Sequence, residues 1–251
     1  MVSVEIENAD NIAVVKLSSG KKNPINPELV RDLSGMIKKV KENSEIKSMV
    51  LTSSNDRFFS IGLDVPELIE YGRDEFRKFI KDFNLLCLEL YTLPKPTIAA
   101  INGHAIAGGC ILALCCDYRF MGDGKKLIGL NEVKLGVSVP YLPQKILEQI
   151  AGGRVATEMI FSGEFYTPEK AFNMGVVDGI FSSDELLQKS IEKARILGEQ
   201  PADAFATVKI NRAGEIKEFY LRKLEKDVDV FVDLWFSDEA QKRLREAAKN
   251  F

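Results

Sequence analysis

Hydrophobic residues follow two patterns that alternate along the chain before residue 200. Short apolar runs, partly β-branched, predict strands, and longer segments with apolar residues at helical spacing predict amphipathic helices. Strands are predicted at residues 2–6, 12–17, 48–52, 97–101, 118–121 and 127–129, with a short strand or turn at 176–181. Helices are predicted at residues 27–43, 73–93, 142–151, 154–161, 167–174 and 184–199. Strands that alternate with helices are typical of an α/β fold.

The pattern changes near residue 200. No strand-like run follows Pro201, and residues 215–249 are charged and helical in spacing. The sequence therefore predicts an α/β core at residues 1–200 and a helical region at residues 201–251. Two helix starts within the core are well marked, because Asn26 and Thr167 each precede a proline and are good N-cap residues.

Composition excludes several classes of protein. Of 251 residues, 45% are hydrophobic and 28% are charged, which is ordinary for a globular domain. The net charge is −3 and no basic stripe stands out, which argues against a nucleic-acid partner. No apolar run is long enough to span a membrane, and the first residues lack a signal-peptide pattern. We expect no membrane partner and a cytoplasmic location.

Cysteine and histidine usage limits the chemistry further. Cys110, Cys115 and Cys116 share one apolar segment with no CxxC spacing, so with Cys87 they are predicted to be reduced core residues. The single histidine, His104, is expected to pack at a turn. One histidine makes a structural zinc site improbable and excludes most histidine-dependent nucleophiles. The remaining chemistry would rest on carboxylates and backbone groups.

Residues 95–117, KPTIAAINGHAIAGGCILALCCD, combine a buried strand, a glycine-rich turn and an apolar helix. Gly108 and Gly109 at the helix start leave amide N–H groups without intrahelical acceptors, and they let the backbone approach a ligand. Such amides suit an oxygen that acquires negative charge. The alternative is a tight connection between strand and helix with no ligand.

Two other segments have unusual features. Residues 57–65, RFFSIGLDV, are apolar for a loop, and Gly62 there permits a special backbone conformation just before Leu63. Alternatively, the phenylalanines of this loop simply fill the core. Residues 130–139, LNEVKLGVSV, carry Glu132 among apolar neighbours. Burial there would raise the pKa of this carboxyl and make it a good base, although a surface glutamate at a strand end is the alternative.

Three motifs together resemble the crotonase (enoyl-CoA hydratase/isomerase) superfamily. They are FSIGLDV at 59–65, AINGHAIAGGCILALCCD at 100–117 and IGLNEVKLGV at 128–137, in the order and spacing of that family. The last two are most similar to the isomerases that move a double bond from the 3- to the 2-position of an enoyl-CoA. The resemblance implies a crotonase-like spiral of repeated ββα units followed by a C-terminal helical region for oligomerisation and pocket cover. It also implies an acyl-CoA thioester substrate and a homotrimer or dimer of trimers.

The resemblance assigns roles by motif position. The backbone N–H groups of Leu63 and Gly108 would form an oxyanion hole, and Glu132 would be the catalytic acid–base residue. The first glutamate of the hydratases falls on Ile111, which cannot accept a proton, and the segment GVSVPYLPQ lacks the glycine-rich run common in hydratases. One glutamate without the other is the isomerase arrangement. Further residues of the motifs are expected to bind substrate: Ser60, Ile61, Gly62, Asp64, Gly109 and Ile111.

The same resemblance bears on cofactors, on CoA binding and on alternative functions. The thioester itself would serve as electron sink, so no metal and no organic cofactor is expected. Basic residues near the loops or in the tail are candidates for the CoA phosphates, and three phenylalanines are candidates for the acyl pocket. Alternatives are hydration, another lyase or hydrolase reaction on acyl-CoA, or a non-catalytic homologue that binds acyl-CoA, protein or RNA. The basic candidates for the CoA phosphates are Lys21, Lys22, Arg57, Lys242, Arg243, Arg245 and Lys249. The candidates for the acyl pocket are Phe76, Phe79 and Phe83.

Overall fold

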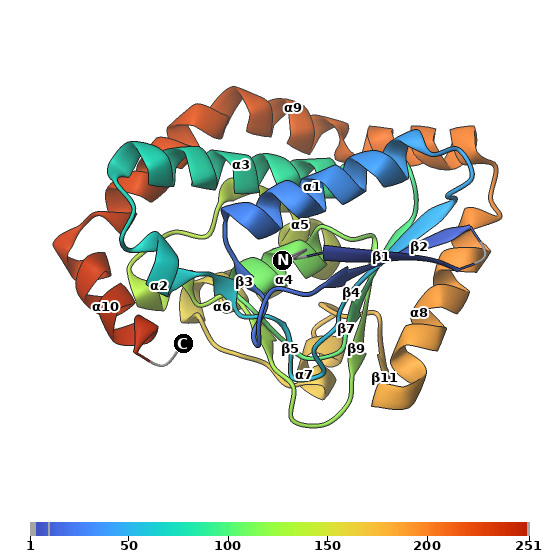
Figure 1. Cartoon of the computed structure of the whole chain (residues 1–251), viewed down its shortest axis with the longest axis horizontal. Coiled ribbons are helices and arrows are strands. Elements are labelled where there is room, and N and C mark those ends of the chain that lie inside the picture. Colours follow the sequence, from blue (N-terminus) through green and yellow to red (C-terminus); the bar gives the residue numbers. More distant parts are fainter. Residues whose placement is uncertain (1–3, 10, 250–251) are drawn as a thin grey trace.

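The computed structural model describes the backbone of residues 4–9 and the backbone and side chains of residues 11–249. Its main sheet has six strands in the order β1-β2-β4-β7-β9-β11 (Figure 1). β1 pairs antiparallel with β2, and all other pairs are parallel. The strands are β1 (Val4–Ala9), β2 (Ile12–Leu17), β4 (Ser48–Ser53), β7 (Thr97–Ile101), β9 (Tyr118–Gly122) and β11 (Gly179–Phe181).

Part of the predicted strand at 2–6 lies outside the described residues, and β1 continues beyond the predicted end to Ala9. The remaining strands of the described residues form two small parallel sheets. One has the order β10-β8-β5, and the other pairs β3 with β6. These strands are β3 (Pro24–Ile25), β5 (Phe58–Ser60), β6 (Gly62–Leu63), β8 (His104–Ile106) and β10 (Ile128–Gly129).

The order of elements confirms the spiral of ββα units. Each turn contributes one strand to the main sheet and the next strand to a small sheet, and then adds a helix. The four helices that follow these strand pairs are α1 (Pro27–Glu42), α3 (Arg73–Tyr91), α4 (Gly108–Leu114) and α5 (Tyr141–Ala151). The remaining helical elements of the core are α2 (Val65–Leu68), the 3₁₀ turn η1 (Glu132–Leu135), α6 (Gly153–Ser162), α7 (Pro168–Asn173) and α8 (Ser183–Gly198).

Helices cover both faces of the main sheet. Alternate residues of its strands, such as Val15 and Leu51, pack into the large core beneath α1, α3 and α4, while Val14 and Val50 face α8. This arrangement explains why the strands read as continuous apolar runs, since both faces are buried. The predicted caps are confirmed, because the Asn26 side chain accepts the Leu29 amide at 3.0 Å and the Thr167 side chain accepts the Lys170 amide. All four cysteines are free and buried, as predicted.

The tail differs in detail from its prediction. Helix α9 (Ala202–Trp235) begins earlier than residue 215, and the helical stretch breaks at Phe236 before α10 (Asp238–Ala248). The break has a local cause, because the Ser237 side chain caps α10 by accepting the Ala240 amide. α9 lies along α3, and α10 lies beside α2 (Figure 1). The helical tail therefore packs directly on the core.

Two groups of polar contacts fix α9. On α3, Arg77 pairs with Glu225 at 2.8 Å and with Asp229 at 2.7 Å, and these pairs are exposed. At the other end, the nearly buried Lys209 pairs with Asp117 at 2.7 Å. Among the described residues, no helix is long and apolar enough to cross a membrane, and no group of three or more His, Cys, Asp or Glu side chains is placed to hold a metal.

Candidate active site

A cavity of about 470 Å³ lies between the spiral core and the helical tail. Its walls are mostly apolar and come from segments far apart in the chain. Glu132 is the one ionisable residue among the described residues that line it. The lining comprises Ile61, Leu63, Val65, Ile80, Phe83, Asn84, Ile106, Ala107, Gly108, Ile111, Asn131, Glu132, Leu135, Val137, Pro140, Phe165, Phe231, Trp235, Leu244 and Ala247.

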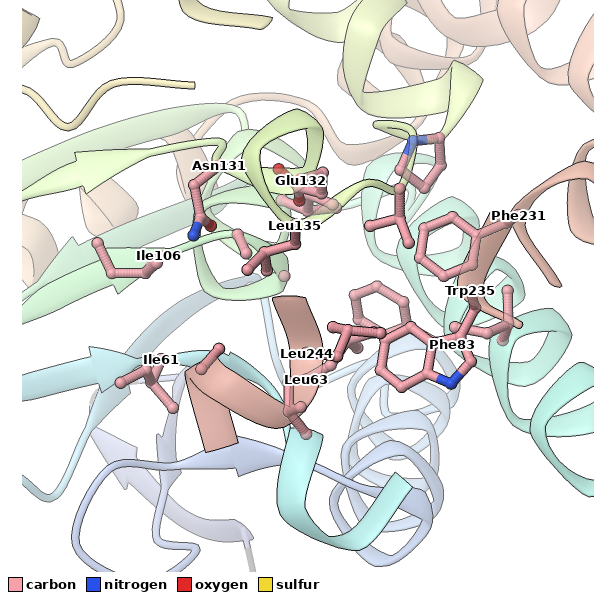
Figure 2. A pocket seen from close by; sticks show the side chains of 18 of the residues that line it. Ile61, Leu63, Phe83, Ile106, Asn131, Glu132, Leu135, Phe231, Trp235 and Leu244 are labelled. Carbon is pink, nitrogen blue, oxygen red and sulfur yellow. The ribbon is translucent and has the colours of Figure 1, made fainter. Parts of the chain in front are cut away.

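Figure 2 shows that the two ends of the cavity differ in character. Phe83, Phe231 and Trp235 gather at one end, where α3 meets α9. Asn131 and Ile106 lie at the opposite end, and Glu132 projects from η1 between the two ends. The cavity thus has an aromatic end, a more polar end and a single carboxyl between them.

The first predicted amide belongs to Leu63 in β6. The neighbouring amide of Asp64 donates to the Ile25 carbonyl of β3 at 2.9 Å. Successive amides of an extended strand point to opposite edges, so the Leu63 N–H points away from β3. Leu63 itself lines the cavity. Its amide is therefore free of the β3 ladder.

The second predicted amide belongs to Gly108, the first residue of α4. Ala107 precedes it with φ +48° and ψ −118°, a conformation that costs a non-glycine residue of the order of 1–3 kcal/mol. The Ala107 carbonyl accepts the Ile111 amide, so α4 begins at this point. Like every first-turn amide, that of Gly108 has no acceptor within its own helix. The strained turn aims the start of α4 at the cavity.

The two turns are in direct contact. Gly62 has φ +92°, and a Cβ placed there would lie 2.9 Å from the Ile106 oxygen and 3.1 Å from the Gly108 nitrogen. Only glycine satisfies both this φ and this close approach. The backbone segments of the FSIGLDV and AGGC motifs therefore converge at one wall of the cavity, as the sequence predicted. The oxyanion role of the two amides stays a prediction.

Glu132 begins η1 and is only 5% exposed. Its Oε2 atom is buried without a hydrogen-bond partner among the described residues. Burial raises the pKa of this carboxyl from 4.5 to about 7, partly offset by the Glu132 backbone N–H, which donates to the carboxylate. A buried carboxylate with an unused oxygen and a pKa near 7 is well suited to accept and return a proton. The surface alternative for Glu132 is wrong.

The structure separates the six predicted substrate-binding residues into two groups. Ile61 and Ile111 line the cavity. Ser60, Gly62, Asp64 and Gly109 do not, and each has a structural reason to be in the motif; that of Gly62 is the close contact with the turn at Gly108. The Ser60 hydroxyl donates to the Asn23 carbonyl, and the Asp64 side chain caps α2. A Cβ at Gly109 would lie 2.3 Å from the Ser60 carbonyl oxygen, so this glycine lets α4 pack on β5.

Other candidates are also placed. Of the three phenylalanines, Phe83 lines the cavity, Phe76 stacks on the lining residue Trp235 with ring centroids 4.3 Å apart, and Phe79 borders a different groove. His104 packs against the Phe58 ring, and its Nδ1 accepts the Leu127 amide, as expected for a residue that packs at a turn.

None of the seven basic candidates lines the cavity, and four of them form two groups outside it. Lys22 and Arg57 flank the Phe58 ring, and Lys242 and Arg243 line a groove that shares Leu135 and Ala247 with the cavity. The structure brings neither group into the cavity itself.

Two amide side chains in the cavity wall escaped prediction. Asn84 lies on α3 within an apolar stripe, and Asn131 precedes Glu132. The Asn131 Oδ1 atom is buried without a partner in the described part of the chain. The only sequence signal was an amide inside an apolar pattern, which by itself points to no ligand.

The chain belongs to the enoyl-CoA hydratase/isomerase family, whose model matches residues 7–250. Mitochondrial enoyl-CoA delta isomerase 1 of Mus musculus is 36% identical over 192 residues, which are 75% of this chain and 66% of that protein. A short-chain-enoyl-CoA hydratase of Clostridium acetobutylicum is 29% identical over 201 residues, 79% of this chain and 77% of that protein. The human mitochondrial delta3-delta2-enoyl-CoA isomerase structure superposes with a TM-score of 0.96 at 27% identity, covering 99% of this chain and 97% of that chain.

Proposed function

We propose that this protein is an enoyl-CoA isomerase that moves the double bond of a 3-enoyl-CoA to the 2-position. The observation that carries the proposal is the single carboxyl of the cavity. Glu132 is buried beside two converging backbone turns. Ile111, which stands where a hydratase would have its other glutamate, also lines the cavity. One acid supports proton transfer within the substrate, whereas hydration needs a second group to position water.

The chemistry follows from these groups. Glu132, ionised, removes a proton from C2 of the thioester, and the electron pair moves into the thioester carbonyl. The amides of Leu63 and Gly108 stabilise the oxygen of the resulting dienolate; loss of one such donor typically costs about 3 kcal/mol of barrier. The protonated Glu132 then returns the proton to C4, which places the double bond between C2 and C3. The thioester is the electron sink, so the proposed reaction uses no cofactor.

A labelled substrate tests the shuttle directly. Substrate deuterated at C2 should give product that retains part of the label at C4, because one carboxyl carries the atom between the two carbons. Glu132→Gln should abolish this transfer, while Glu158→Gln, an exposed change on α6, should leave it intact. Rapid formation of 3-hydroxyacyl-CoA from a 2-enoyl-CoA and water would instead favour the hydratase function of the Clostridium relative.

The acyl-CoA handle and the assembly belong to the same proposal. The two basic groups, at Arg57 and at Lys242, can be told apart by substitution. Replacing a residue that contacts a phosphate should raise KM for the CoA thioester but not for the pantetheine thioester, whereas replacing a residue of the other group should change neither KM.

We also propose a homotrimer or a dimer of trimers. Large apolar residues exposed on α9 and α6 support it, including Val208 at 67% and Phe161 at 77% exposure. Light scattering should give three or six times the 28.1 kDa chain mass. Cytoplasmic location stays a prediction.

A further inference from the structure

Asn84 is a buried polar side chain that the proposed mechanism does not use. It lies on α3, is only 4% exposed, and lines the cavity together with Ile80 and Phe83. These positions share one helix face, since residues three or four apart are neighbours on a helix. Within the described part of the chain, the Asn84 side chain takes part in no hydrogen bond, and its polar atoms are not among those fully enclosed by protein, so they are open to the cavity that Asn84 lines. An amide donor and acceptor therefore stand unpaired in an apolar wall.

Buried polar groups in native proteins nearly always have partners. Leaving the Asn84 amide covered by hydrocarbon would be unfavourable, because its lost hydrogen bonds to water would not be replaced. A side chain of similar size, such as leucine, would fit the apolar stripe of α3 without this cost. The amide therefore indicates that something polar occupies this part of the cavity when a ligand is bound.

The position of α3 indicates which part of a ligand that is. Figure 2 shows Phe83 at the aromatic end, with Phe231 and Trp235, away from Asn131 and Ile106. A Cβ placed at Gly108 would lie 3.5 Å from the tip of the Phe83 ring. The α3 wall thus borders the space next to Gly108 on the aromatic side of the cavity. Because hydrocarbon walls suit an alkyl chain better than the polar pantetheine arm, we place the acyl chain along this side.

We propose that Asn84 forms a subsite for a hydroxyl group carried by the acyl chain of the substrate, an inference that rests on the proposed function. A hydroxyl both donates and accepts, and so it complements the carbonyl and the NH₂ of one amide. A plain alkyl chain would cover the amide and leave it unpaired. The cavity should therefore select hydroxylated acyl-CoA thioesters over unsubstituted ones of the same length.

Calorimetry with unreactive ligands tests this preference. Decanoyl-CoA is compared with hydroxydecanoyl-CoA thioesters that carry the hydroxyl at successive carbons beyond C4. We expect the wild-type protein to bind at least one of them about tenfold more tightly than decanoyl-CoA. Asn84→Leu should lose that preference and bind decanoyl-CoA at least as tightly as before. Leu85→Ala, which changes α3 outside the cavity, should keep it.

Two results would overturn the inference. One is a wild-type protein that binds decanoyl-CoA as tightly as every hydroxylated ligand, a measurement that does not depend on any variant. The other is an equal loss of affinity for both ligand classes in Asn84→Leu, which would indicate that the amide serves only to position other groups. Turnover of 3-decenoyl-CoA by the wild-type protein is measured in parallel. Its absence would refute the isomerase proposal while the binding preference is judged separately.

Discussion

The replacement Glu132→Gln tests both the chemistry and the electrostatics of the site. Each pKa unit corresponds to about 1.4 kcal/mol, so the rise from 4.5 to about 7 means that the ionised carboxyl destabilises the fold by about 3 kcal/mol. Below pH 4.5 the carboxyl is protonated in folded and unfolded chains, and the cost is absent. It grows as pH rises between the two pKa values and is complete above pH 7.

Glutamine keeps the shape of Glu132 but cannot ionise. Urea unfolding of wild type and Glu132→Gln should therefore give similar free energies of unfolding near pH 4.5, and near pH 8 the variant should be more stable by about 3 kcal/mol. Isomerisation should fall roughly a hundred- to ten-thousandfold in the variant. In the wild type, kcat/KM should rise with pH to a plateau above an apparent pKa of about 7.

The outcomes separate two parts of the reasoning. A stability difference that does not change between pH 4.5 and pH 8 would show that the carboxyl is solvated in solution. Full activity in Glu132→Gln would remove it as the base. Glu158→Gln, on the exposed side of α6, is the matched control. Its free energy of unfolding relative to wild type should be the same at pH 4.5 and pH 8, and its isomerisation rate should equal that of wild type.

Three further replacements probe the surroundings of the site. Gly62→Ala should lower kcat and the melting temperature together, because its Cβ would meet the Ile106 oxygen at 2.9 Å; an unchanged kcat would contradict the role of this turn. Trp235→Phe removes bulk at the aromatic end, and kcat/KM across 3-enoyl-CoA substrates should shift toward longer chains; an unshifted optimum would place the acyl chain elsewhere. Lys209→Met removes the ion-pair partner of Asp117 and leaves this carboxylate with the Thr97 amide and hydroxyl as donors; urea unfolding should reveal a loss of about 3 kcal/mol, which the added change Asp117→Asn should partly restore.

The helices and central strands were predictable because their signals are local. The caps at Asn26 and Thr167 and the apolar stripe of α3 depend on residues within a few positions of one another. The strand β8 was missed because its three residues lie directly after the Asn102-Gly103 turn and show no alternation. The break between α9 and α10 was missed because Ser237 is a modest signal within a charged helical stretch.

The site, too, has residues that the sequence could predict and residues that it could not. The motifs located Glu132 and the two backbone turns, because the special residues there are glycines and an acid within apolar surroundings. The motifs could not tell which neighbours face the ligand. Gly109 and Ser60 contact each other rather than the cavity, a pairing set by how α4 packs on β5. Asn84 and the aromatic residues of α9 reach the cavity only through tertiary packing, which sequence spacing does not encode.

The residues that line the cavity range from Ile61 to Ala247 along the chain, and the last two of them, Leu244 and Ala247, belong to α10. During translation, the main sheet could pair once β11 has left the ribosome, yet the pocket would still be open on its α10 side. A chain that stops before α10 would hold the main sheet without a closed cavity, and we expect it to be inactive. The helix that closes the cavity is thus synthesised only after the main sheet can form.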